Sequence, residues 1–306
     1  MKNILAKIFY PVIAIASLLG LINSPLALFS GILFAFFFTS PLKKFSHKLI
    51  HYLLKFSIIG LGFGMLIKET LTTSANSLSL TFLSITLTIG LGLLLTRLLK
   101  IDLKLGYLIT SGTSICGGSA IAAISSVIKA NGKTISIALG VVFLLNAIAL
   151  FTFPVIGHWL ELTQHDFGLW CAIAIHDTSS VVGAALNYGD EALKIATTVK
   201  LSRTLWIIPL SIFSLFVFKT KGQKIKMPYF ILLFIAAIII NSFHLIPLTI
   251  TSVIVLISKR LLVLTLFIVG TTISFKDLKS TGIKPILLAI FLWVFISVFS
   301  LVYITY

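Results

Sequence analysis

The sequence predicts an all-α polytopic membrane protein, and three observations support this fold class. Of the 306 residues, 58% are hydrophobic and only 10% are charged, whereas a soluble domain carries about 25% charged residues. The apolar stretches recur at lengths close to the roughly 20 residues that a membrane helix needs. The basic residues gather in the short stretches between them. We therefore expect one transmembrane domain over residues 1–306, with no separate soluble domain.

About eleven apolar segments are expected to enter the bilayer. The first begins after Met1-Lys2 and resembles a signal peptide, but it has no small-x-small cleavage pattern, so we interpret it as a retained helix. A cell membrane is the expected location. The segments cover residues 5–22, 25–40, 48–67, 77–98, 105–128, 134–156, 167–187, 192–218, 228–243, 247–274 and 283–304.

The positions of the basic residues predict the topology. The formal net charge is +16, and because these charges lie in short loops, the positive-inside rule explains them better than nucleic-acid binding does. A cytoplasmic N-terminus places Lys43, Lys44, Lys221 and Lys224 inside and Tyr306 outside. We expect no nucleic-acid partner.

Two of the apolar segments have the wrong composition for simple spanning helices. Residues 111–120 contain three glycines and four hydroxyl residues, and glycine costs about 1 kcal/mol relative to alanine inside a helix. Residues 174–185 are similarly rich in small and polar residues. Paired interruptions of this kind are the best sequence pointer to the binding site of a transporter. We therefore expect two discontinuous helices.

The charges leave two paths open for these interrupted segments. If both cross the bilayer, Lys129 and Lys133 lie outside and Glu161 and Asp166 lie inside. If both are re-entrant and enter from opposite sides, every basic cluster lies inside. The positive-inside rule favours the re-entrant path.

Ionisable residues deep in the predicted bilayer are candidate functional residues. Lys200 and Arg203 are spaced i, i+3, which places them on one helix face. With Asp177 as the nearby acid, one positive charge is in excess, which implies an anion or a wet cavity. The alternative is that both cations reach a surface, or pair with Asp177 and a helix C-terminus. Asp177 can also cap a half-helix that begins at Thr178.

The small residues of both interruptions complete the predicted site. Hydroxyl groups and glycine amides suit an anion better than a cation, although the same residues would also allow close helix packing. His176 is expected to be a hydrogen-bonded core histidine rather than a metal ligand. No metal cluster, cofactor motif or catalytic constellation is present, so we expect no metal, no cofactor and no enzyme activity. The predicted substrate-binding residues are Thr113, Ser114, Cys116, Gly117, Gly118, Ser119, His176, Asp177, Thr178, Ser179, Lys200 and Arg203.

Two weaker patterns concern the remaining segments. Residues 58–64 and 267–273 both combine glycine with apolar residues, and each precedes a Lys-acid pair. Their opposite predicted orientations suggest an inverted repeat. Lys259 and Arg260 lie in the middle of the tenth segment, either at an interface or facing a cavity.

The motifs at residues 112–130, 174–185 and 198–203 together resemble the bacterial YeiH-like membrane proteins. This family consists of uncharacterised integral membrane proteins named as sulfate exporters, and the resemblance covers essentially the whole chain. It implies the bacterial inner, or cell, membrane as the location. The first motif is also similar to the discontinuous helix of cation–proton antiporters and bile-acid symporters. That second resemblance implies inverted repeats and broken helices that cross the membrane, so we expect crossing here despite the charges.

The expected function is secondary transport of a small anion, sulfate- or sulfonate-like, by alternating access around the two broken helices. An alternative is a proton- or sodium-coupled cation antiporter that uses Asp177. In antiporters of that superfamily acidic residues carry the cation, and in this chain only Asp177 could do so. A non-transporting membrane protein is the third candidate. The expected partners are the lipid bilayer and the anion. A coupling proton or sodium ion and a homo-oligomer are left open.

Overall fold

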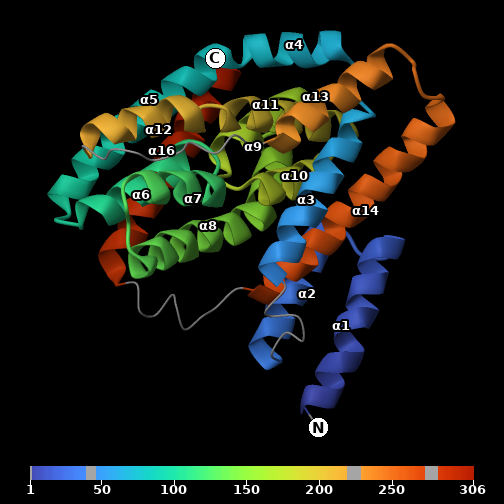
Figure 1. Cartoon of the computed structure of the whole chain (residues 1–306), viewed down its shortest axis with the longest axis horizontal. Coiled ribbons are helices and arrows are strands. Elements are labelled where there is room, and N and C mark those ends of the chain that lie inside the picture. Colours follow the sequence, from blue (N-terminus) through green and yellow to red (C-terminus); the bar gives the residue numbers. More distant parts are fainter. Residues whose placement is uncertain (1, 39–45, 219–228, 273–281) are drawn as a thin grey trace.

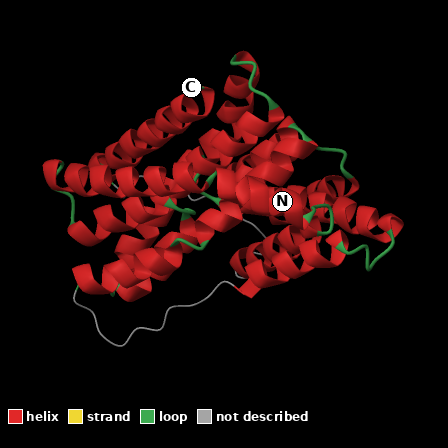
Figure 2. Ribbon diagram, turned by 90° about the horizontal axis from the view of Figure 1, so that it is seen from above, coloured by secondary structure: helices red, strands yellow, loops and turns green. Residues whose placement is uncertain are grey.

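The computed structural model describes residues 2–38, 46–218, 229–272 and 282–306, and this part of the chain contains helices and loops without a strand (Figures 1 and 2). The helices are α1 (Lys2–Leu19), α2 (Ser24–Phe37), α3 (Ser46–Gly62), α4 (Ile67–Asn76), α5 (Leu78–Leu98), α6 (Leu103–Ser114), α7 (Gly118–Val127), α8 (Gly132–Trp159), α9 (Gln164–Ala174), α10 (Thr178–Tyr188), α11 (Asp190–Thr204), α12 (Ile207–Val217), α13 (Tyr229–Ser242), α14 (Leu248–Thr272) and α16 (Ile283–Thr305).

Five stretches of this part are long and apolar enough to cross a bilayer: α5, α8, α14, α16 and the nearly continuous pair α11–α12. The 28 residues of α8 extend over about 42 Å at 1.5 Å per residue, more than the roughly 30 Å of a hydrocarbon core. Most other apolar helices are shorter. The all-α class is thus confirmed and the helix lengths agree with a membrane protein, whereas the count of eleven segments stays a prediction.

The two interrupted segments return to the side from which they start, so the expected crossing is wrong. The Lys104 ammonium near the start of α6 donates to the Lys129 carbonyl after α7, at 3.1 Å. If α6 and α7 ran on in one direction, their 22 helical residues would separate these groups by about 33 Å. The two helices therefore form a hairpin, which we call hairpin 1 (residues 103–127).

The second interrupted segment closes in the same way. The Tyr188 hydroxyl at the end of α10 donates to the Leu162 carbonyl just before α9, at 2.7 Å. The Gln164 side chain at the start of α9 accepts a hydrogen bond from the Glu191 amide, 3.0 Å away. We call this unit hairpin 2 (residues 164–188). The hairpin form of both segments agrees with the re-entrant path that the charges favour.

Helix α8 fixes the relative orientation of the two hairpins. It begins just after hairpin 1 and ends just before hairpin 2, so the open ends of the hairpins lie at its opposite ends (Figure 1). Each hairpin consequently points inward from its own end. Their turns, which we call tip 1 (residues 115–117) and tip 2 (residues 175–177), approach each other near the middle of α8.

The loops without excess basic residues gather near one another. The Asn241 side chain donates to the Met65 carbonyl at 3.0 Å, and the Ser242 hydroxyl accepts from the Ile67 amide at 2.8 Å. Helix α4, which has no buried residue, begins there and was not predicted. This grouping agrees with the predicted topology. Lys43, Lys44, Lys221 and Lys224 lie outside the described residues.

Glycines bring α14 close to α2 and α3. A Cβ atom on Gly31 would lie 2.2 Å from the Phe267 carbonyl oxygen, and one on Gly270 would lie 2.5 Å from that of Leu28. A Cβ on Gly60 would meet the Ser258 hydroxyl at 1.9 Å. Small residues allow such close backbone contact between membrane helices. The inverted repeat that residues 58–64 and 267–273 suggest stays a prediction.

Candidate functional site

Tip 1 depends on a glycine with an unusual backbone. Helix α6 ends at Ser114, and the Gly117 amide donates back to the Gly112 carbonyl at 2.8 Å. Gly117 has φ +59° and ψ −121°, which is a conformation that only glycine adopts readily. The chain can then start α7 at Gly118.

Tip 2 carries its own helix cap. Asp177 precedes α10, and its carboxylate accepts hydrogen bonds from the Ser179 amide at 3.0 Å and from the Ser179 hydroxyl. An aspartate in this position satisfies an amide that has no partner inside the helix. The expected N-cap role of Asp177 is therefore confirmed.

The two tips touch each other. A Cβ atom on Gly117 would lie 3.3 Å from the Asp177 amide nitrogen and 3.3 Å from the His176 carbonyl carbon. The interruptions are therefore in contact although about 60 residues separate them in sequence. This contact brings the two predicted halves of the site together.

Asn146 holds tip 2 against the middle of α8. Its side-chain oxygen accepts from the amides of His176, at 3.1 Å, and Asp177, at 3.2 Å. Asn146 lies halfway along α8 and is 3% exposed. It was not among the predicted site residues, although a single asparagine within residues 134–156 is a visible signal, because a polar side chain inside a membrane segment usually has a specific partner.

Lys200 connects the two tips through backbone carbonyls. Its ammonium donates to Ile115 of tip 1 at 3.1 Å, and to Ala172 and Ile175 of hairpin 2 at 3.2 and 2.7 Å. An ammonium has three donors, and all three are used. Ile115 and Ile175 follow the last residues of α6 and α9, where backbone carbonyls lack helical partners.

Arg203, one turn further along α11, holds the end of α6. Its Nε donates to the Ser114 carbonyl at 3.0 Å, and one terminal nitrogen donates to the same oxygen. The other terminal nitrogen donates to the Ser84 hydroxyl of α5 at 3.1 Å. Lys200 and Arg203 are both 0% exposed. Both cations therefore contact helix C-termini, as one of the alternatives above predicted. Neither cation reaches a surface.

The described residues contain no ion pair between Asp177 and either cation. That part of the expectation is wrong, because the carbonyls of the helix ends already take the donors of Lys200. The predictions that Lys200, Arg203 and the other named residues contact a substrate stay predictions.

The start of α7, next to tip 1, is more exposed than the tips themselves. Gly118 is partly exposed, Ser119 is exposed, and Asp177 is partly exposed. No side chain caps α7, so its first amides keep the partial positive charge of a helix N-terminus. By contrast, the predicted site residues Thr113, Ser114, Cys116, Thr178 and Ser179 are buried.

Several buried polar atoms near the tips have no hydrogen-bond partner among the described residues. They include both ring nitrogens of His176, the side-chain nitrogen of Asn146 and the hydroxyl of Thr113. His176 was expected to be hydrogen-bonded, and this is wrong for its imidazole ring. Only its backbone amide has a partner among the described residues, the Asn146 side chain. Unpaired buried polar groups are rare in proteins, so these atoms are candidate ligand contacts.

The described residues contain no group of His, Cys, Asp and Glu that could hold a metal ion.

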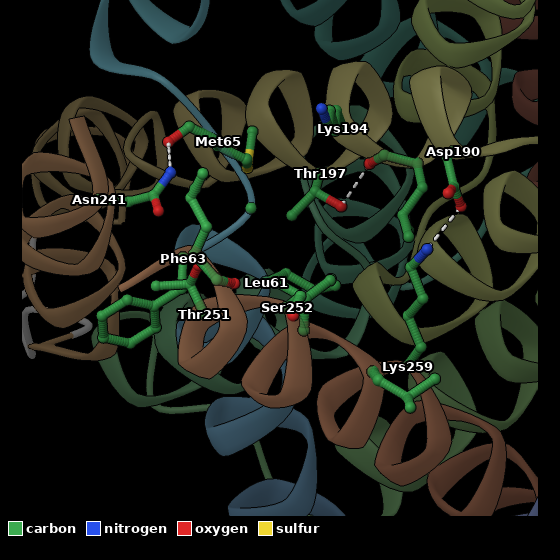
Figure 3. Close-up of a pocket in the computed structure, with 15 residues that line it drawn as sticks. Leu61, Phe63, Met65, Asp190, Lys194, Thr197, Asn241, Thr251, Ser252 and Lys259 are labelled. Atoms are coloured by element: carbon green, nitrogen blue, oxygen red, sulfur yellow. Dashed lines mark hydrogen bonds and ion pairs between the residues drawn. The ribbon is translucent and has the colours of Figure 1, made fainter. Parts of the chain in front are cut away.

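A cavity of about 550 Å³ lies beside α11 at the end of the molecule that holds the open end of hairpin 2 (Figure 3). Lys194 and Thr197 line it from α11, and Asn241 and Ser252 line it from α13 and α14. The Lys259 ammonium bonds the Asp190 carboxylate at 2.6 Å across it. Thr197 precedes Lys200 by one turn, so the cavity approaches the buried cations.

Fold and site together define a polytopic membrane protein with two inward-pointing helical hairpins. The profile of a family described as "Conserved hypothetical protein 698" matches residues 4–289, and the chain belongs to this family. The chain is 50% identical over 293 residues to the UPF0324 membrane protein PBPRB0970 of Photobacterium profundum, and this match covers 96% of this chain and 90% of that protein. A UPF0324 membrane protein of Bacteroides thetaiotaomicron is 48% identical over 286 residues, with 92% and 86% coverage. No solved structure matches the chain.

Proposed function

We propose that this protein is a secondary transporter that carries a small anion across the membrane by alternating access around the two hairpin tips. The observation that carries the proposal is the contact between tip 1 and tip 2 near the middle of α8. Interrupted helices that meet at mid-membrane depth are the usual substrate sites of secondary transporters. Irregular backbone is tolerated at that depth only where protein buries it or a cavity reaches it.

The charges around the tips favour an anion. Lys200 and Arg203 are two buried cations, and Asp177 is the acid that belongs to the tips. The four helix ends contribute about half a charge each, with the two N-termini positive and the two C-termini negative, so they cancel. About one positive charge remains, and a bound anion would balance it.

The N-terminus of α7 is the proposed contact for the anion. Its uncapped amides at Gly118 and Ser119 lie where the tips are exposed, and anions bind well at helix N-termini. The unpartnered His176 ring, the Asn146 amide nitrogen and the Thr113 hydroxyl supply further hydrogen-bonding capacity nearby. The cavity beside Thr197 is the proposed route from the end with few basic residues. The resemblance to YeiH-like proteins supports sulfate or a sulfonate as the substrate.

The partial exposure of Asp177 supports one competing function, a proton- or sodium-coupled cation antiporter in which this carboxylate carries the cation. The capping bonds from Ser179 occupy one oxygen of the carboxylate. The substitution Asp177→Asn separates the two functions, because asparagine also caps helices well but carries no charge.

The test uses purified protein in liposomes and in detergent. We expect uptake of sulfate or of a small sulfonate, and a rise in melting temperature with the same anion but not with chloride. A ligand at one hundred times its Kd stabilises the folded state by about 2.7 kcal/mol. Asp177→Asn should keep or strengthen this binding, since it removes a nearby negative charge. The antiporter would be established instead by two results together. No anion that is tested binds, and Asp177→Asn abolishes a flux that sodium or protons drive. Absence of every flux and every anion effect would favour a non-transporting protein.

A further inference from the structure

The surroundings of the Lys200 ammonium are those of a bound cation. Three carbonyl oxygens, from Ile115, Ala172 and Ile175, lie 2.7–3.2 Å from its nitrogen. They belong to both hairpins and lie at or next to the C-terminal ends of α6 and α9. The side chain is 0% exposed, so the ammonium is shielded from bulk water.

Such a group of carbonyls needs a positive charge in its centre. Each of these helix ends carries about half a negative charge, and oxygen atoms that converge in a dry interior without a donor are costly. Carbonyls of unwound segments and of half-helix C-terminal ends are also the ligands that bind sodium in secondary transporters. The same oxygens can therefore be satisfied by a free ion or by an ammonium that the chain supplies.

We infer that Lys200 is a tethered cation, whose ammonium occupies a monovalent-cation site between the two hairpins and replaces a bound sodium ion there. Arg203 does not share this role, because its backbone contact is with Ser114 of hairpin 1 alone. Lys200 contacts both hairpins and joins them. The two tips then stay together without sodium. A consequence that rests on the proposed function is that anion transport does not require sodium.

Removal of the tether should create a site for a free cation. Lys200→Ala deletes the ammonium and most of its alkyl chain, which leaves three carbonyls and space for a small ion. Thermal unfolding is measured in detergent at constant chloride concentration with sodium, ammonium, ethylammonium or N-methylglucamine as the cation. The matched control is Lys194→Ala, because Lys194 lies on the same helix but is exposed to the cavity.

We expect wild type and Lys194→Ala to melt at the same temperature in sodium and in N-methylglucamine. Lys200→Ala should melt about 5 °C or more lower in N-methylglucamine, the shift that corresponds to loss of several buried hydrogen bonds. At least half of this loss should return with sodium, ammonium or ethylammonium. Should Lys200→Ala fail to fold, Lys200→Gln is measured in the same way, because its amide still donates to two of the carbonyls.

Two results would overturn the inference. One is a wild-type melting temperature that depends on sodium at fixed ionic strength. The other is a Lys200 variant that is equally unstable with every cation, or as stable as wild type. These measurements contain no substrate anion. They are therefore independent of the proposed function, which fails separately if no anion binds.

Discussion

The two hairpin tips solve the same structural problem with different charges. At both, the C-terminal end of the first helix faces a buried cation from α11, Lys200 or Arg203. At tip 2 the second helix begins with a capping carboxylate, Asp177. At tip 1 the second helix begins with Gly117, and no side chain caps it.

This difference locates the open position of the site. A carboxylate already balances the positive end of α10, whereas the positive end of α7 lies bare at Gly118 and Ser119. The three predictions that follow remove a feature that the tips share, remove one that tip 1 alone has, and make the two N-termini alike.

The largest effect is expected where the tips are alike, at the cations that hold the C-terminal ends. Arg203→Ala leaves the Ser114 carbonyl without its two donors and a large space in a buried region. Unsatisfied buried groups cost about 1–3 kcal/mol each, and the lost packing adds to this, so we expect a loss of about 3 kcal/mol. Titration with SDS in mixed micelles measures the free energy of unfolding.

Arg203→Lys should recover part of this loss, because one donor can still reach the carbonyl although the forked geometry is absent. The matched control is Arg97→Ala at an exposed position of α5, which should stay within about 0.5 kcal/mol of wild type. An Arg203→Ala protein that loses less than 1 kcal/mol would mean that the end of α6 does not depend on this cation.

The next effect compares Gly117 of tip 1 with its neighbour Gly118, the first residue of α7. Gly117→Ala forces φ +59°, ψ −121° onto a residue with a side chain, which costs about 1–3 kcal/mol. Its Cβ also meets the Asp177 amide nitrogen at 3.3 Å. We expect a loss of about 2 kcal/mol in the same titration.

Gly118→Ala is the control for that substitution. Its nearest neighbours would be side-chain atoms of Phe143 and Leu139 at 3.2–3.5 Å, which can move slightly, and alanine favours the helix. The change in free energy of unfolding should stay below about 1 kcal/mol. Equal losses at both glycines would remove the argument that tip 1 needs a special backbone.

The sequence predicted where the helices stop better than it predicted where the chain then goes. The glycines and hydroxyl residues of 111–120 and the cap signal at Asp177 mark the interruptions, because these are local preferences of single residues. A crossing helix and a hairpin contain the same local signals. The choice depends on contacts such as Lys104 with Lys129, and only the distribution of basic residues pointed to it.

The sequence offered the helix C-termini as partners of the buried cations only as an alternative. The spacing of Lys200 and Arg203 placed them on one face, and both do face the hairpin ends. A search for partners among ionisable residues finds Asp177, yet the structure uses backbone carbonyls, which every residue carries and no pattern marks. Ser84 and Asn146 were missed because the sequence does not show which distant group a polar side chain of an apolar segment contacts.

The smallest change in stability, with the sharpest change in binding, is expected when the two N-termini are made alike. Ser119→Asp places a carboxylate in the first turn of α7, at an exposed position. A negative charge there is worth about 0.3–1 kcal/mol of helix stabilisation, so the free energy of unfolding should stay equal or rise slightly. The same carboxylate occupies the charge position that the anion would fill, and anion binding should be lost.

The neutral isostere Ser119→Asn separates charge from shape in this experiment. It has nearly the size of aspartate but adds no negative charge, so it should retain anion-dependent thermal stabilisation and uptake. A more distant control is Ser126→Asp, at an exposed position near the other end of α7, which should keep anion binding because the effect of a helix end fades within one turn. If Ser119→Asp bound the anion as tightly as wild type, the bare N-terminus of α7 would not be the anion site. The difference between the tips would then serve folding alone.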